Sequence, residues 1–141
     1  MHRRTLLALP LIPAVANAQT ESYEAAEQSI LAGRLAAPGG ITIEMPVLSE
    51  NGNSVDIAVR VESPSTRADH VTAIHILAEK NPIPRVASFT LGPRSGRAEV
   101  ATRIRLATTQ TILVLAETSR GQVHRAAREV IVILGACVDG G

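Results

Sequence analysis

Apolar and polar residues alternate along much of the chain after residue 40, which predicts a protein built mainly of β-strands. In 55–61, Val or Ile at every odd position alternates with Asp, Ala or Arg at every even one. This period of two is typical of a strand with one buried face. Similar patterns, separated by turn-forming residues, predict seven strands at 41–45, 55–61, 71–78, 86–91, 100–106, 111–118 and 124–134.

Other segments predict turns and the way one strand is buried. Ser49–Asn53 is a cluster of turn residues, and Arg120-Gly121 predicts a hairpin. The prolines of Asn81–Pro84 lack an N–H group, so this segment predicts an extended turn. The continuous apolar run Val130–Ile133 predicts a strand that is covered on both faces.

Residues 21–31 follow a different pattern, because Tyr23, Ala26 and Ile30 recur at helical spacing. Gly33 is a suitable residue for the end of this helix. The predicted fold is therefore mainly β, an immunoglobulin-like β-sandwich of about seven strands with an N-terminal helix and a flexible C-terminal arm. A seven-stranded barrel is the alternative architecture.

The first 18 residues have the features of a secretory signal peptide. Arg3-Arg4 precedes a short apolar run at 6–15, and Ala16-Asn17-Ala18 offers a cleavage site after Ala18. The arginine pair favours the twin-arginine route, although Sec signals also have basic starts. As a membrane anchor the run is too short, because a span needs about 20 apolar residues. We expect a periplasmic protein with no membrane anchor.

The rest of the chain suits one domain, with a helix and linker at 19–40, a sandwich at 41–134 and an arm at 135–141. Removing residues 1–18, which contain two arginines and no acid, changes the net charge from +1 to −1. One Tyr and one Phe cannot form a stacking platform for bases. Charge and composition therefore argue against nucleic acid as a partner.

Cys137 is the only cysteine, and its neighbours are mostly small: Gly135, Ala136, Val138, Asp139, Gly140 and Gly141. We expect these residues to form a thin, mobile arm that exposes the thiol. In an oxidising compartment this cysteine stays free, pairs with another molecule or holds a covalent cargo. Because cysteine readily forms reversible S–S bonds, the pattern suggests a sulfur carrier.

No nucleophile–base–orienter set, phosphate loop or metal motif is evident in the sequence. His70, His75 and His124 match no standard zinc spacing, so structural or surface roles are favoured for them. Arg103 and Arg105 could bind an anion or a partner, but a solvated strand face is the simpler interpretation. We therefore predict a carrier on which other enzymes act, with no catalytic residues, metal or cofactor of its own.

Four segments, taken together and in this order, resemble the SoxY family, the sulfur-carrying subunit of the periplasmic Sox thiosulfate-oxidation system. The segments are Pro46–Gly52, Glu79–Pro84, Thr102–Ala107 and the tail at Cys137. The resemblance covers nearly all of the chain after the signal peptide. It implies an immunoglobulin-like fold and a heterodimer with a SoxZ-like subunit.

The resemblance also implies that Cys137 holds sulfur intermediates while the protein docks transiently to sulfur-oxidation enzymes. In that family a haem protein attaches thiosulfate oxidatively, a hydrolase releases sulfate, and a molybdenum enzyme oxidises the remaining sulfur where it is present. The family tail is typically Gly-Gly-Cys-Gly-Gly. Here Ala136 replaces the second glycine, and Val138-Asp139 follows the cysteine.

Two other functions stay open on the residues alone. The chain could be an exported β-sandwich adaptor that uses its tail cysteine for an intermolecular disulfide. It could also be a thiol redox protein, although such proteins usually have a second, resolving cysteine, which this sequence lacks.

Overall fold

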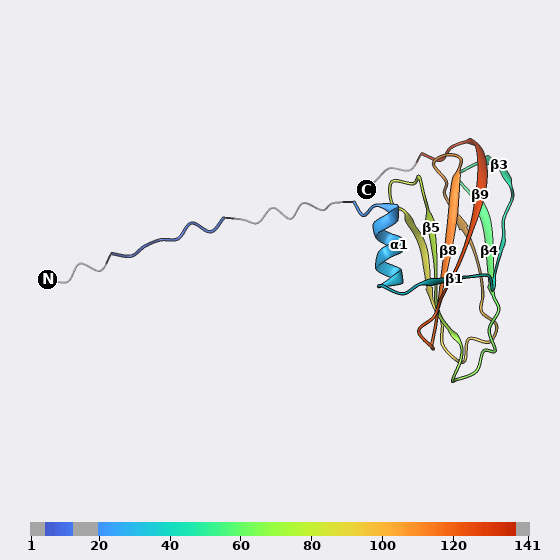
Figure 1. Cartoon of the computed structure of the whole chain (residues 1–141). Coiled ribbons are helices and arrows are strands. Elements are labelled where there is room, and N and C mark those ends of the chain that lie inside the picture. Colours follow the sequence, from blue (N-terminus) through green and yellow to red (C-terminus); the bar gives the residue numbers. More distant parts are fainter. Residues whose placement is uncertain (1–4, 13–19, 138–141) are drawn as a thin grey trace.

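The computed structural model describes residues 5–12 and 20–137, where one helix and nine strands form two facing sheets (Figure 1). The larger sheet has the order β1-β9-β8-β5-β6, and β3 pairs with β9; the smaller sheet has the order β2-β4-β7. The elements are α1 (Tyr23–Leu31), β1 (Ala36–Pro38), β2 (Ile41–Glu44), β3 (Leu48–Asn51), β4 (Val55–Val61), β5 (Val71–Ala78), β6 (Arg85–Thr90), β7 (Glu99–Ile104), β8 (Gln110–Thr118) and β9 (Val123–Leu134).

The predicted immunoglobulin-like sandwich is confirmed, and all seven predicted strands are present as β2 and β4 to β9. The core lies between the two sheets. The Val and Ile residues of β4 are each less than 5% exposed, and they belong to the same buried cluster as Ile74, Ile76, Ile112 and Val114 of the facing sheet. Burial of these aliphatic side chains supplies the main driving force for folding.

Two short strands, β1 and β3, were not predicted. Ala36 pairs in parallel with Val123, and Leu48 pairs in parallel with Ile131, so both strands add to β9. The prediction of a turn over Ser49–Asn53 is therefore wrong in its first part, because residues 48–51 are extended. β1 and β3 have only three and four residues, so neither segment is long enough to display a clear alternation of apolar and polar positions.

The prediction that β9 is covered on both faces is wrong at its C-terminal end. Val130 and Val132 are buried, but Ile131 and Ile133 are 44% and 62% exposed. The neighbouring strand β8 begins at Gln110, opposite Val130, so β9 continues past it. The end of β9 therefore has an apolar outer face on which no other described element packs.

The predicted helix is confirmed as α1, which packs on the outer face of the larger sheet (Figure 1). Ser22 caps its N-terminus by accepting a hydrogen bond from the Ala25 N–H at 3.1 Å. Ala26 and Ile30 are buried against aliphatic residues of β5, β8 and β9. Among the described residues, no helix is long and apolar enough to cross a membrane.

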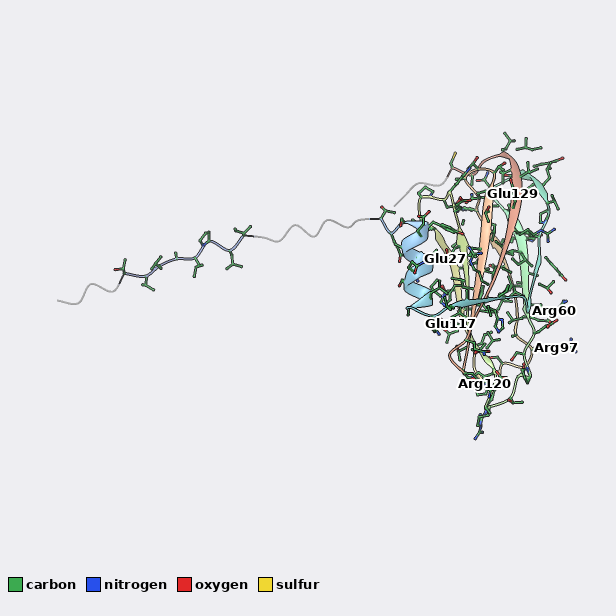
Figure 2. The ribbon with its side chains drawn as sticks, in the orientation of Figure 1. Glu27, Arg60, Arg97, Glu117, Arg120 and Glu129 are labelled. Carbon is green, nitrogen blue, oxygen red and sulfur yellow. The ribbon has the colours of Figure 1, made fainter. Side chains whose placement is uncertain are left out.

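A polar cluster fastens the C-terminal end of α1 to the sheet, with Glu117 of β8 at its centre (Figure 2). Arg34 donates to Glu117 Oε1 at 2.6 Å and also to the Ile30 carbonyl oxygen at 2.8 Å. His75 Nε2 lies 2.8 Å from Glu117 Oε2, and its Nδ1 lies 3.0 Å from Ser88 Oγ. Glu117 therefore links the helix end to the neighbouring strands.

The stability provided by this cluster should depend on pH. Burial alone would raise the pKa of Glu117, but hydrogen bonds from Arg34 and His75 more than offset it, so the pKa is lowered. Its stabilisation is present above the unfolded carboxyl pKa of about 4.3 and is lost as pH falls through the lower folded value. Glu117→Gln should lower the free energy of unfolding by about 2 kcal/mol at neutral pH.

Urea unfolding of the wild type and Glu117→Gln at a series of pH values measures this effect. The difference between the two proteins should shrink as the solution is acidified below about pH 4. A difference that stays constant over the acidic range would contradict the assignment of charge to Glu117.

Candidate functional site

Cys137 lies just beyond the end of β9, and its side chain is exposed with a free thiol. Gly135 and Ala136 connect it to Leu134, the last residue of the strand. The other predicted arm residues, Val138, Asp139, Gly140 and Gly141, lie outside the described residues. The candidate site is therefore the thiol together with the part of the domain from which it emerges.

Backbone hydrogen bonds attach the residues before Cys137 to two loops. The Ala136 N–H donates to the Leu106 carbonyl oxygen at 2.9 Å, and the Gly52 N–H donates to the Leu134 carbonyl oxygen at 2.7 Å. Gly52 in turn accepts from the Leu106 N–H at 2.8 Å. We call Gly52, Leu106 and residues 134–136 the arm root. The first two residues of the predicted arm thus rest on the domain, and Ala136 is only 9% exposed.

Two glycines allow this close backbone packing. A Cβ atom at Gly52 would collide with the Leu106 carbonyl oxygen, and one at Gly135 would collide with the Ala107 carbonyl oxygen. Neither glycine has a positive φ angle, so the requirement at both positions is for space. The sequence suggested a glycine chosen for freedom at position 135, and the structure adds a steric reason.

A buried amide pair supports the loop that holds the arm root. Asn81 donates to the Arg105 carbonyl oxygen at 2.8 Å and accepts from the Ala107 N–H at 3.0 Å. Gln110 donates to the Asn81 amide oxygen at 2.9 Å. Since these bonds bracket Leu106, they hold in place the carbonyl group to which Ala136 is attached.

The structure thus brings together the four segments that carry the family resemblance. Gly52, Asn81 and Leu106 each come from a different segment. Gly52 and Leu106 bond to the residues that precede Cys137, and Asn81 bonds to both neighbours of Leu106. Sequence reasoning identified the segments and predicted turns at Gly52 and Asn81, but it gave Gly52, Asn81 and Leu106 no role in holding the thiol. The sequence pointed to these residues only through the order of the four segments, which resembles that of the SoxY family. The contacts themselves are long-range and leave no local pattern.

The remaining sequence candidates lie elsewhere. His75 belongs to the Glu117 cluster, His70 lies 3.0 Å from the Thr66 carbonyl oxygen, and His124 lies beside Gly40. Arg103 pairs with Asp56 at 3.0 Å on the outer face of the smaller sheet. In residues 5–12 and 20–137, no group of three or more His, Cys, Asp or Glu residues could hold a metal ion.

Residues 27–137 match the family model described as sulfur oxidation protein SoxY. The chain belongs to the SoxY family. This match runs from within α1 to Cys137 and includes the whole arm root. No curated protein matches the chain.

A solved SoxY structure agrees with this assignment. The sulfur carrier protein SoxY from Chlorobium limicola f thiosulfatophilum has 34% sequence identity and a TM-score of 0.64. The alignment covers 79% of this chain and 98% of that one.

Superoxide reductases share the fold. A variant from Ignicoccus hospitalis has 17% identity and a TM-score of 0.60, with 77% of this chain and 86% of that chain covered. A putative superoxide reductase from Thermotoga maritima has 19% identity and a TM-score of 0.58, with coverages of 69% and 93%. At these identities the likeness shows a common sandwich, and function must be argued from the SoxY family and the site.

Proposed function

We propose that this protein carries sulfur intermediates on Cys137 during thiosulfate or sulfur oxidation, as one half of a complex with a SoxZ-like subunit. The observation that supports this most is the position of the thiol. The sole cysteine of a SoxY-family chain is exposed directly after a root held by backbone hydrogen bonds. A thiol in this place can enter another protein while the domain stays folded.

The proposed cargo chemistry needs only the thiolate and external enzymes. In loading, the Cys137 thiolate and the outer sulfur of thiosulfate form an S–S bond, and two electrons pass to a haem enzyme. Water then attacks the terminal sulfonate group, sulfate and two protons leave, and a persulfide remains on Cys137. The carrier supplies a nucleophile that makes reversible S–S bonds, and the enzymes supply the catalysis.

Several features of the proposal follow from the export signal and the family. The protein acts in the periplasm after cleavage near Ala18, it holds no cofactor, and its sulfur cargo is substrate. Docking to the enzymes is transient, because a carrier has to leave each one to reach the next. The SoxZ-like subunit is the permanent partner.

An exported adaptor that forms an intermolecular disulfide is the second candidate, and the same exposed, free thiol favours it. The two functions differ in what is bound to Cys137. A carrier holds sulfur or a thiosulfonate group, whereas an adaptor holds another polypeptide.

Intact-mass analysis of the protein purified from the periplasm of its host, grown on thiosulfate, tests the proposal. We expect added sulfur or thiosulfonate mass that a reducing agent removes and that peptide mapping places on Cys137. A disulfide-linked dimer as the sole modified form would support the adaptor. A thiol that stays unmodified under these conditions would contradict both functions.

A further inference from the structure

An exposed apolar patch lies beside the arm root. Its large aliphatic residues are between 44% and 62% exposed: Val47, Leu48, Ile131 and Ile133. The Ile131 N–H donates to the Val47 carbonyl oxygen at 2.9 Å, and Leu48 is the register partner of Ile131. Since side chains alternate along strands, Leu48, Ile131 and Ile133 share one outer face. Contiguous aliphatic surface of this kind marks an interaction site.

The short reach of the thiol determines what has to contact this patch. Ala136 is attached to the Leu106 carbonyl oxygen, so Cys137 is only one residue beyond a fixed point. One extended residue spans about 3.5 Å. An enzyme that receives the sulfur therefore has to bring the rim of its active site against the arm root and the aliphatic residues next to it.

Acidic residues border the patch and indicate the charge of the partner. Glu129 precedes Ile131 by two positions on β9, and Glu50 follows Leu48 by two on β3, so alternation places both on the outer face. Both residues are exposed, and Figure 2 shows Glu129 toward the end of the sandwich where the chain leaves β9. An enzyme that binds thiosulfate and anionic adducts needs a cationic site. The positive potential at the entrance of such a site attracts a carrier whose docking surface has acidic residues.

We propose that the apolar patch and its two glutamates form the docking surface for the basic entrance of a sulfur-transferring enzyme. This inference rests on the proposed carrier function. A permanent subunit seated on the same residues would cover the base of a short arm, so the SoxZ-like subunit binds elsewhere. The apolar centre provides affinity, and the acidic border speeds association and makes it depend on salt.

A loading assay with variants at the two ends of β9 tests the docking surface. The full chain, in its native complex, is added to the periplasmic fraction of a host strain that lacks its gene, with thiosulfate as the substrate. Initial rates of adduct formation are measured by intact mass over a range of carrier concentrations. The Ile131→Ser/Ile133→Ser variant should raise the half-saturating carrier concentration about tenfold and leave the maximal rate within about twofold.

The control is Leu35→Ser, which replaces an exposed aliphatic residue beside β1 that is 95% exposed. β1 pairs with the start of β9, roughly 36 Å along the strand from Leu134 at 3.3 Å per residue. This variant should load like the wild type. Glu50→Lys/Glu129→Lys should slow loading at low salt and weaken its salt dependence. Glu62→Lys should not, because this exposed residue directly follows β4, at the other end of that strand from Gly52. All variants should react with iodoacetamide at the wild-type rate, which shows that the thiol itself is unchanged.

Several outcomes would overturn the docking proposal. Loading of Ile131→Ser/Ile133→Ser at wild-type rates across the concentration range would do so. Loss of the co-purifying subunit in that variant would assign the patch to the permanent interface instead. If the wild type gains no adduct in an extract that consumes thiosulfate, the carrier function itself fails, and the docking proposal fails with it.

Discussion

Replacement of Cys137 with serine is expected to abolish sulfur loading and thiosulfate-dependent growth of the host. The hydroxyl group has nearly the shape of the thiol, but it cannot form the S–S bonds that the proposed cycle requires. The side chain is exposed, so the free energy of unfolding should change by less than about 0.5 kcal/mol. The measurements are intact mass, thiosulfate consumption by a complemented deletion strain, and thermal unfolding.

A relocated thiol provides the matched control for this loss. Ser29 is exposed on α1, so Cys137→Ser/Ser29→Cys restores a surface cysteine at a position away from the arm root. It should react with small reagents and still fail to support thiosulfate consumption. Restored consumption would show that any exposed thiol suffices, and the position of Cys137 would then carry no functional meaning.

Alanine at Gly52 or Gly135 should produce the largest loss of stability. Each added methyl group would collide with a backbone carbonyl oxygen, Leu106 O or Ala107 O, and a backbone atom cannot move aside as a flexible side chain can. The backbone must shift, and the hydrogen bonds of the arm root stretch with it. We expect each substitution to lower the free energy of unfolding by about 3 kcal/mol.

Gly92→Ala is the control, because Gly92 has no atom within 4 Å of its would-be Cβ and has no positive φ angle. It should change the free energy of unfolding by less than about 0.5 kcal/mol. Urea unfolding of the three variants gives the comparison. Equal stability of Gly52→Ala and Gly92→Ala would mean that the arm root is looser than its hydrogen bonds indicate.

Strands that bury one face against the other sheet could be predicted from local pattern. In β4 the inward Val55 and Val59 face the core while Asp56 and Arg60 face solvent, so the sequence itself displays the two faces. The helix was predictable for the same reason, since Ala26 and Ile30 form its buried stripe.

Features that depend on distant partners could not be predicted in this way. β3 is a strand because Leu48 pairs with Ile131, and the residues Leu48–Asn51 contain no pattern that predicts this partner. Likewise Ile131 and Ile133 are of a residue type that is usually buried, and their exposure depends on where β8 and α1 end.

The candidate site likewise has one part that local sequence predicts and one part that depends on distant partners. The identity and exposure of Cys137 could be anticipated from its place in a tail of small residues. The hydrogen bond between Ala136 and Leu106 could not be anticipated. It depends on a loop that the side chains of Asn81 and Gln110 hold through long-range hydrogen bonds.

The pairing of β9 also decides how the molecule responds to force. β9 is bonded to β8 over most of its length, and β1 and β3 add parallel pairings at its two ends. A protein that binds Cys137 and pulls along the strand axis loads all of these hydrogen bonds together in shear. A force perpendicular to the strand would instead break them one at a time. The force needed to pull β9 out of the sheet along this axis should therefore be high. A pull on the thiol should end in release of the tail by the bound protein before the domain unfolds.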